Sequence, residues 1–195
     1  MRTFIGIDLP EEIKDNLKEL IEKLKKIRES KLVKKENLHI TLKFLGEVEE
    51  EKITLINRKL QNCTKEFENF NVKIKGIGVF PSEKRVKVLW VGVEDEENLK
   101  KLNEKIEDEL KNFGFEKEKE FVAHITIARF KSIPNLNLIK DLMEKYKDVL
   151  FGQFIVKNFQ LYESKLTPFG PIYKIIESYE FNRYNKRKEE EKWER

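Results

Sequence analysis

The chain contains two histidines, and each one begins the same pattern of histidine, isoleucine, threonine and an aliphatic residue. The two copies occupy residues 39–42 and 124–127 and lie 85 residues apart. Imidazole titrates at about pH 6.5, so one ring can accept a proton while another donates one. Threonine hydroxyls can donate hydrogen bonds to oxygens that gain negative charge in a transition state. The pair therefore suits cleavage of a phosphodiester, which needs a base for the attacking oxygen and an acid for the leaving oxygen.

Other catalytic chemistries lack their residues in this sequence. Two histidines with no cysteine or acidic ligand beside them fall short of the three or four protein ligands of a zinc site. No Gly-x-Ser-x-Gly nucleophile motif and no glycine-rich phosphate loop is present. A Lys-x-Asp-Gly motif of the kind used by ATP-dependent ligases is also missing. We therefore expect no metal and no cofactor.

Two strands are needed to position these residues. Both patterns fall in short runs of residues that favour β-structure, which predicts strands over residues 38–45 and 121–130. Because alternate residues of a strand share a face, each histidine points the same way as the threonine two residues later, Thr41 or Thr126. If the two strands face each other, two imidazoles and two hydroxyls converge on one small space.

The remaining elements repeat in the same order. Hydrophobic spacing predicts further strands over 3–9, 71–80, 86–93, 154–164 and 172–181, and helices over 10–30, 49–67, 96–113 and 135–150. Val72 and Val156 lie near the start of corresponding predicted strands, 84 residues apart, close to the histidine spacing. The order of strand, helix, histidine strand, helix and hairpin indicates an internal duplication of about 85 residues.

The composition is typical of a folded globular protein without a membrane span. The 195 residues are 39% hydrophobic and include 14 phenylalanines, enough for one domain or two small lobes. No stretch resembles a membrane span or a signal peptide, and Cys63 has no disulfide partner, so we expect a cytoplasmic protein. Charged residues make up 39%, a balance typical of hyperthermophiles, and the net charge of +4 permits a nucleic-acid partner. Residues 183–195 form a charged tail that we expect to be a frayed helix or disordered.

The paired motif resembles the 2H phosphoesterase superfamily. The stretches 2–10, 39–46, 124–129 and 170–173 are most similar to the RNA 2′,3′-cyclic phosphodiesterases, also called 2′-5′ RNA ligases. This resemblance covers residues 1–182 as a single bilobal domain. It implies an α+β fold in which two antiparallel sheets flank a central cleft, with helices on the outer faces. It also implies that terminal strands exchange between the lobes, so the lobes need not equal the sequence halves.

The resemblance assigns roles to the four repeated side chains. His39 would be the proton donor and His124 the proton acceptor, while Thr41 and Thr126 would hold the phosphate. The two motifs are too alike for the sequence itself to separate acid from base. The expected reaction is hydrolysis of an RNA 2′,3′-cyclic phosphate to a 2′-phosphate without metal. In reverse, a 5′-hydroxyl RNA would be joined through a 2′-5′ bond.

Two further positions match substrate-binding residues of the family, Phe44 and Arg129, each five residues after its histidine. Phe44 would stack on a base, or it is a core residue. Arg129 would supply a fixed positive charge to phosphate, or it forms a surface salt bridge. Ideal strand alternation puts an offset of five on the face opposite the histidine, so Arg129 reaches the site only if the strand twists, bulges or ends there.

The expected partner is RNA ending in a 2′,3′-cyclic phosphate, such as a tRNA fragment, bound by a monomer without membrane contact. Lysines that could steer RNA, or that are simply solvated surface, are Lys34, Lys35, Lys43, Lys73 and Lys75. Two alternatives remain open. One is a related phosphoesterase acting on a small cyclic phosphate or a 2′-5′ oligonucleotide, and the other is an RNA-end-binding module without turnover.

Overall fold

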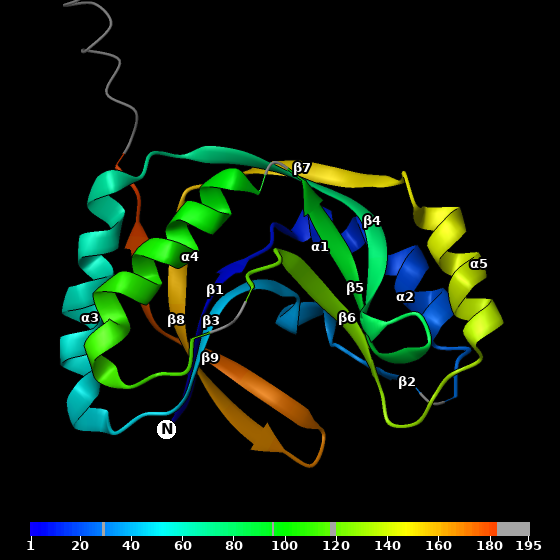
Figure 1. Cartoon of the computed structure of the whole chain (residues 1–195), viewed down its shortest axis with the longest axis horizontal. Helices are drawn as coiled ribbons and strands as arrows, with labels where there is room; N and C mark the ends of the chain where they lie inside the picture. The colour runs from blue at the N-terminus through cyan, green and yellow to red at the C-terminus, as the bar shows by residue number, and fades with distance from the viewer. Residues whose placement is uncertain (29, 95, 118–119, 183–195) are drawn as a thin grey trace, which may run out of the picture.

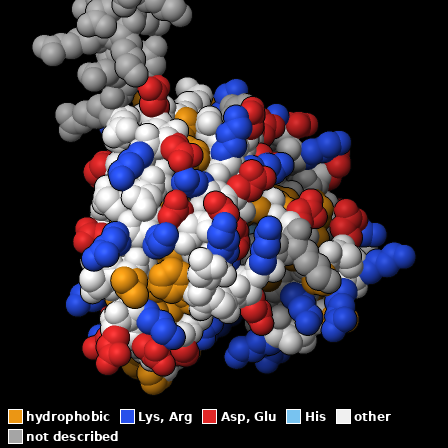
Figure 2. Space-filling view, turned by 60° about the vertical axis from the view of Figure 1, so that its left-hand side comes forward, with side chains coloured by type: hydrophobic (Ala, Val, Ile, Leu, Met, Phe, Trp, Pro, Cys, Tyr) orange, Lys and Arg blue, Asp and Glu red, His pale blue; other side chains and the backbone are white. Residues whose placement is uncertain are grey.

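The computed structural model describes residues 1–28, 30–94, 96–117 and 120–182. The charged tail expected over 183–195 lies outside the described residues. Within the described ranges, no helix is both long and apolar enough to cross a membrane. Figure 2 shows a surface on which lysine and arginine side chains alternate with aspartate and glutamate, as the mixed charge of the sequence indicates.

The strands of the described chain form one antiparallel sheet in the order β7-β4-β5-β6-β3-β1-β8-β9, and β2 pairs with β6. Their bounds are β1 (Arg2–Asp8), β2 (Ser30–Leu32), β3 (His39–Glu47), β4 (Phe70–Ser82), β5 (Arg85–Glu94), β6 (His124–Phe130), β7 (Leu150–Val156), β8 (Asn158–Thr167) and β9 (Gly170–Glu180). The two histidine strands, β3 and β6, are neighbours at the middle of this order.

The sheet divides into two halves between β3 and β6. These strands are paired only through Ile40 and Ile125, whereas neighbouring strands elsewhere pair over longer registers. Strands β3, β1, β8 and β9 form one half, and β6, β5, β4, β7 and β2 form the other. The expected α+β fold with two antiparallel sheets on either side of a cleft is confirmed, and one residue pair joins the two sheets.

Helices cover the outer face of each half, as Figure 1 shows. The α-helices of the described chain are α1 (Glu11–Asn16), α2 (Lys18–Leu24), α3 (Glu50–Cys63), α4 (Glu97–Leu110) and α5 (Leu136–Tyr146), with short 3₁₀ turns η1 (Lys35–Asn37), η2 (Thr64–Glu66) and η3 (Lys111–Phe113). Helices α3 and α4 pack together against the half that holds β3 and β9. Helices α1, α2 and α5 pack against β7, β2 and β4 of the other half. The buried apolar side chains of both halves form one continuous core.

The lobes exchange strands between the sequence repeats. The β4–β5 hairpin comes from the first repeat but pairs with β6, and the β8–β9 hairpin comes from the second repeat but pairs with β1. The implied exchange of terminal strands is therefore confirmed. Its consequence is that each histidine motif is framed by residues from both repeats.

Three local predictions were wrong. The helix predicted over 10–30 is two helices, because it is interrupted at Leu17 between α1 and α2. Strand β2 was missed because three residues, Ser30–Leu32, are too few to show a period. Strand β7 was not recognised as a separate strand. Leu150 completes the helical spacing of the preceding segment, and the end of β7 was merged with β8 in the strand predicted over 154–164.

Candidate active site

A β-bulge interrupts β3 directly after its threonine. On the neighbouring strand β1, the adjacent residues Gly6 and Ile5 lie opposite Thr41 and Lys43, which leaves Leu42 without an opposite residue. Such an extra residue shifts the alternation of side chains by one position. Leu42 and Lys43 are accordingly both buried in succession.

Strand β6 carries the same bulge at the equivalent position. Trp90 and Leu89 of β5 lie opposite Thr126 and Ala128, so Ile127 is the extra residue. The burial patterns of β3 and β6 are identical over their first seven residues. The duplication has therefore preserved the bulge as well as the histidine and threonine.

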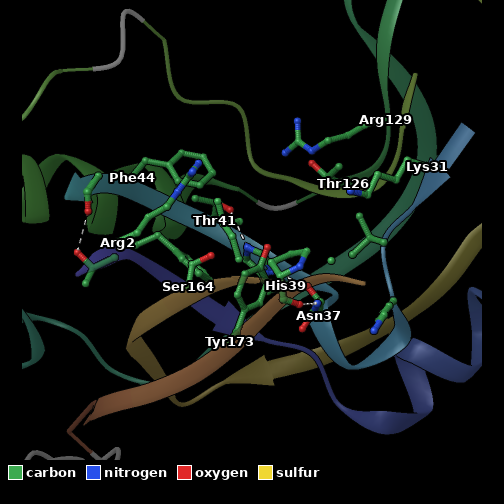
Figure 3. Close-up of a pocket in the computed structure, with 18 of the residues that line it drawn as sticks. Arg2, Lys31, Asn37, His39, Thr41, Phe44, Thr126, Arg129, Ser164 and Tyr173 are labelled. Atoms are coloured by element: carbon green, nitrogen blue, oxygen red, sulfur yellow. Dashed lines mark hydrogen bonds between the residues drawn. The ribbon is translucent and has the colours of Figure 1, made fainter. Parts of the chain in front are cut away.

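The bulges turn the fifth residue after each histidine into the cleft. Phe44 is 53% exposed and lines the cleft, so it is not a core residue. Arg129 lines the same cleft, although ideal alternation would have pointed it to the opposite face. Figure 3 shows Arg129 on the side of Thr126 and Phe44 on the side of Thr41. The bulge that the sequence required for Arg129 to reach the site is present.

The pairing of Ile40 with Ile125 brings the two motifs together around an approximate two-fold axis. In an antiparallel pair this register sets His39 toward Thr126 and Thr41 toward His124. All four side chains are only partly exposed. The charges of His124 and Arg129 both act on the pKa of His39, which places these groups within electrostatic reach of each other.

Both imidazoles are oriented in the same way by their own strands. Nδ1 of His39 donates to the backbone oxygen of Asn37 at 2.6 Å, and Nδ1 of His124 donates to that of Val122 at 2.7 Å. Because a carbonyl oxygen only accepts, the neutral rings carry their proton on Nδ1 and leave Nε2 for chemistry. Nε2 of His39 lies 2.9 Å from the hydroxyl oxygen of Thr41.

Burial lowers the pKa of both histidines. For His39 the hydrogen bond to Asn37 and the charge of Asp8 oppose this effect, while the charges of His124 and Arg129 add to it. For His124 the hydrogen bond to Val122 opposes the lowering and the charge of Arg129 adds to it. Both rings are thus held neutral near pH 7 before an anion enters the cleft.

Aromatic rings pack around each histidine, but differently. The His39 ring lies 4.8 Å from that of Phe4 and 5.3 Å, edge to face, from that of Tyr173. The His124 ring lies 5.0 Å, edge to face, from Phe80 and 6.1 Å from Trp90. These contacts restrict the orientation of the two imidazole planes.

The cleft has a volume of about 760 Å³. Five of the six residues predicted for the site line it: His39, Thr41, Phe44, Thr126 and Arg129. His124 is not among the lining residues and lies half-buried beside Phe80 and Trp90. Its strand alternation nonetheless puts it on the same face of β6 as Thr126.

Four cations line the cleft: Arg2, Lys31, Lys34 and Arg129. Within the described chain none of them forms a salt bridge, whereas the neighbouring Lys35 pairs with Glu11 and Asp15. Lys31 lies opposite Arg129 in the pairing of β2 with β6. A cleft with several uncompensated cations favours a ligand that carries negative charge.

The lysines that could steer RNA according to the sequence occupy different environments in the structure. Lys34 lines the cleft, while Lys35 pairs with Glu11 and Asp15 on the surface. For Lys43 the prediction was wrong. Its side chain is 1% exposed and lies 2.6 Å from the carboxylate of Glu107, behind the β3 bulge. The bulge buries this position, so Lys43 cannot meet a ligand.

Several residues of the cleft were missed as site residues. Arg2, Asn37, Ser164 and Tyr173 also line it and come from β1, the η1 turn and the β8–β9 hairpin (Figure 3). Tyr173 lies in the stretch 170–173, which resembles the family, and this resemblance could have identified it as a site residue. No group of three histidine, cysteine, aspartate or glutamate side chains in the described ranges is arranged to hold a metal ion.

A family model described as LigT like Phosphoesterase matches this chain twice, over residues 7–90 and 91–173. The chain belongs to the LigT-like phosphoesterase family. The two matches each contain one histidine strand, in agreement with the duplication seen in β3 and β6. Membership of this family therefore rests on both halves of the molecule independently.

Relatives in this LigT-like family are similar over nearly their whole length. The RNA 2′,3′-cyclic phosphodiesterase of Methanocaldococcus jannaschii is 45% identical over 179 residues, which cover 92% of this chain and 100% of the relative. That of Thermotoga maritima is 42% identical over 184 residues, covering 93% and 96%. Both organisms are thermophiles, in agreement with the charged composition.

Two solved structures share the fold. The protein TT0787 of Thermus thermophilus superposes with a TM-score of 0.79 at 29% identity, covering 95% of this chain and 100% of that one. Escherichia coli LigT in its apo form gives a TM-score of 0.73 at 23% identity, covering 93% and 97%. The fold of this chain is therefore common to these proteins.

Proposed function

We propose that this protein hydrolyses the terminal 2′,3′-cyclic phosphate of RNA to a 2′-phosphate. The observation that carries the proposal is the pair of imidazoles whose Nδ1 atoms are bound to carbonyl oxygens, so that two Nε2 atoms are available beside one cationic cleft. The names of the relatives, RNA 2′,3′-cyclic phosphodiesterases, support the same substrate.

The reaction needs two proton transfers. Nε2 of His124 accepts a proton from water, and the water oxygen attacks phosphorus. The bond from phosphorus to the 3′ oxygen breaks, and His39, protonated on Nε2, gives its proton to that oxygen. The product carries a 2′-phosphate and a free 3′-hydroxyl, and the proton lost by water resides on His124. A substrate anion favours the protonated form of His39, opposing the effect of burial.

The remaining residues hold the phosphate and the nucleoside. The hydroxyls of Thr41 and Thr126 donate hydrogen bonds to the non-bridging phosphate oxygens, which gain charge in the transition state. Arg129 adds a guanidinium that matches phosphate geometry. Phe44 offers an exposed ring on which the terminal base stacks.

The same two transfers, in the same direction, join RNA ends when an RNA 5′-hydroxyl replaces water. His124 then activates the 5′-hydroxyl, and the product is a 2′-5′ phosphodiester with a free 3′-hydroxyl. We include this ligation in the proposal because it requires no additional group. The balance between hydrolysis and ligation is set by the concentration of 5′-hydroxyl ends relative to water.

The first test is a gel assay with an RNA oligomer that ends in a 2′,3′-cyclic phosphate, in the presence of EDTA. Wild type should convert it to the 2′-phosphate, and His39→Ala and His124→Ala should each lower the rate by about 10²- to 10⁴-fold. Binding without conversion by wild type would instead favour an RNA-end-binding module. Conversion of only small cyclic phosphates would favour a related phosphoesterase.

The roles of the two histidines, which follow the family motif, need a separate test. A substrate with sulfur in place of the 3′ bridging oxygen has a leaving group that needs no proton. His39→Ala should cleave this substrate at close to the wild-type rate, while His124→Ala should remain slow. Rescue of His124→Ala in place of His39→Ala would reverse the assignment.

A further inference from the structure

The β8–β9 hairpin presents an exposed aromatic ring to the cleft. This hairpin projects from the sheet at the bottom of Figure 1. Phe169 at its tip is 85% exposed and lines the cleft, together with Leu166 and Pro171. An exposed phenylalanine in a cleft, not covered by other apolar side chains, indicates a surface that binds a ligand.

The tip is held in place although its ring is exposed. The amide of Phe169 donates to the hydroxyl oxygen of Thr167 at 3.2 Å, and that hydroxyl donates to the backbone oxygen of Gly170 at 2.6 Å. The side-chain amide of Asn37 donates to the backbone oxygen of Pro171 at 2.8 Å. Because Asn37 also accepts from His39, the tip is tied directly to the catalytic strand.

Phe169 and Phe44 lie on opposite sides of the histidine. The tip is bound at Asn37, just before β3 begins, whereas Phe44 lies five residues beyond His39 along the strand. The ring of Phe4 contacts both, with its centroid 4.8 Å from that of His39 and 6.1 Å from that of Phe44. A single nucleotide with its base on Phe44 therefore leaves the other side of the cleft unfilled.

We name that other side the hairpin arm, lined by Lys31, Lys34, Asn37, Leu166, Phe169 and Pro171. One of its walls is apolar and aromatic, and the other carries the ammonium groups of Lys31 and Lys34. Neither lysine has a salt-bridge partner in the part of the chain that the structure describes. An aromatic platform facing a cationic wall is the combination that binds single-stranded nucleic acid.

We propose that the hairpin arm binds the nucleoside on the 5′-oxygen side of the phosphate, with its base stacked on Phe169. This inference rests on the proposed function, since it places the scissile phosphate at the two histidines. A 2′-5′ phosphodiester then has one nucleoside on Phe44 and the other on Phe169. Lys31 and Lys34 face the phosphates of an RNA strand that continues beyond the second nucleoside.

The test is a binding measurement that does not depend on turnover. The probe is a 2′-5′-linked diadenosine monophosphate whose first sugar lacks the 3′-hydroxyl, so that nothing can attack its phosphorus. Wild type should bind this probe more tightly than 2′-AMP. Phe169→Ala should weaken binding of the dinucleotide by about 5- to 150-fold, the range for one stacked base, and leave 2′-AMP binding unchanged.

Two variants serve as controls. Phe169→Trp keeps a stacking surface and should bind the dinucleotide as wild type does. Ile175→Ala removes another apolar side chain of the same hairpin, 52% exposed but outside the cleft, and should change nothing. Equal affinity of wild type and Phe169→Ala for the dinucleotide would overturn the inference. The inference would also be overturned if Phe169→Ala lost as much affinity for 2′-AMP as for the dinucleotide.

Failure of the proposed function gives a different result. If wild type does not hydrolyse the RNA 2′,3′-cyclic phosphate, the proposed activity is wrong whatever the affinities are. If wild type hydrolyses it and Phe169→Ala keeps the wild-type affinity for 2′-AMP and the wild-type thermal unfolding temperature, the phosphate site is intact in the variant. Any loss of dinucleotide binding is then caused by the missing Phe169 ring in the hairpin arm.

Discussion

At the scale of single residues, each imidazole is oriented by a carbonyl two residues before it. That geometry comes from the local chain, which is why the sequence pattern alone located His39, His124 and their threonines. The environment of each ring is not local. Tyr173 and Phe80 reach the two rings from hairpins distant in sequence, and no spacing rule predicted them.

The pKa values of the two histidines give a direct prediction. Because burial lowers the pKa of both rings, His39 and His124 should titrate below the usual 6.5 in the free protein. Binding of 2′-AMP brings a phosphate anion to the cleft and should raise the pKa of at least one ring. The protein has only two histidines, so NMR titration of the imidazole protons resolves both. Titration of either free ring at or above 6.5 would contradict this account.

Gly6 provides a second prediction at the residue scale. A Cβ atom at this position would lie 2.9 Å from the backbone oxygen of Ile40 and 3.3 Å from Cδ2 of His39. Gly6→Ala should therefore displace the imidazole and lower kcat/KM by about 10- to 100-fold. Thermal unfolding, measured in parallel, sets a temperature at which the variant is folded. Wild-type activity at that temperature would show that the ring tolerates the methyl group.

At the scale of elements, the bulges of β3 and β6 decide which residues enter the cleft. Sequence alternation correctly predicted the faces of the first four residues of each motif and failed from the fifth. Leu42 and Ile127 are ordinary strand residues, and nothing in their identity marks an extra residue in the pairing. The bulge exists only in relation to the neighbouring strand, so Phe44 and Arg129 could be placed by family resemblance but not by periodicity.

The buried pair behind the β3 bulge gives the prediction for this scale. Lys43 is 1% exposed and Glu107 on α4 is 13% exposed, so Lys43→Met leaves a nearly buried carboxylate without its cation. The free energy of unfolding should fall by about 3–5 kcal/mol. The double variant Lys43→Met with Glu107→Leu should recover most of that loss, as measured by urea denaturation.

A matched surface pair serves as the control for this measurement. Lys101 and Glu97 lie 2.7 Å apart on α4 with side chains that are largely exposed. Lys101→Met should cost at most about 1 kcal/mol, because solvent screens this pair. If the two lysine variants lose equal stability, the Lys43 pair does not fasten the bulge to α4.

At the scale of the whole molecule, the exchange of hairpins between lobes explains why the cleft could only partly be predicted. The duplication was visible in the sequence because spacing and element order repeat. The partners of each hairpin were not, since β8 pairs with β1 across more than 150 residues of chain, as the pairing of Ile5 with Leu161 shows. Residues such as Ser164 and Phe169 therefore entered the cleft from an element assigned to the opposite half.

The two buried histidines also make the stability of the whole molecule depend on pH. Their pKa values are lowered in the folded protein relative to about 6.5 in the unfolded chain, so below that pH the unfolded chain binds more protons. The free energy of unfolding should be unaffected by this term above about pH 6.5 and should decrease as the pH falls below it. A variant with His39→Asn and His124→Asn lacks both groups, and its stability should change less between pH 6.5 and 5. Urea denaturation of both proteins at matched pH values measures the difference. Parallel pH dependence of the two proteins would mean that the imidazoles are not held neutral by burial, and that other groups govern acid unfolding.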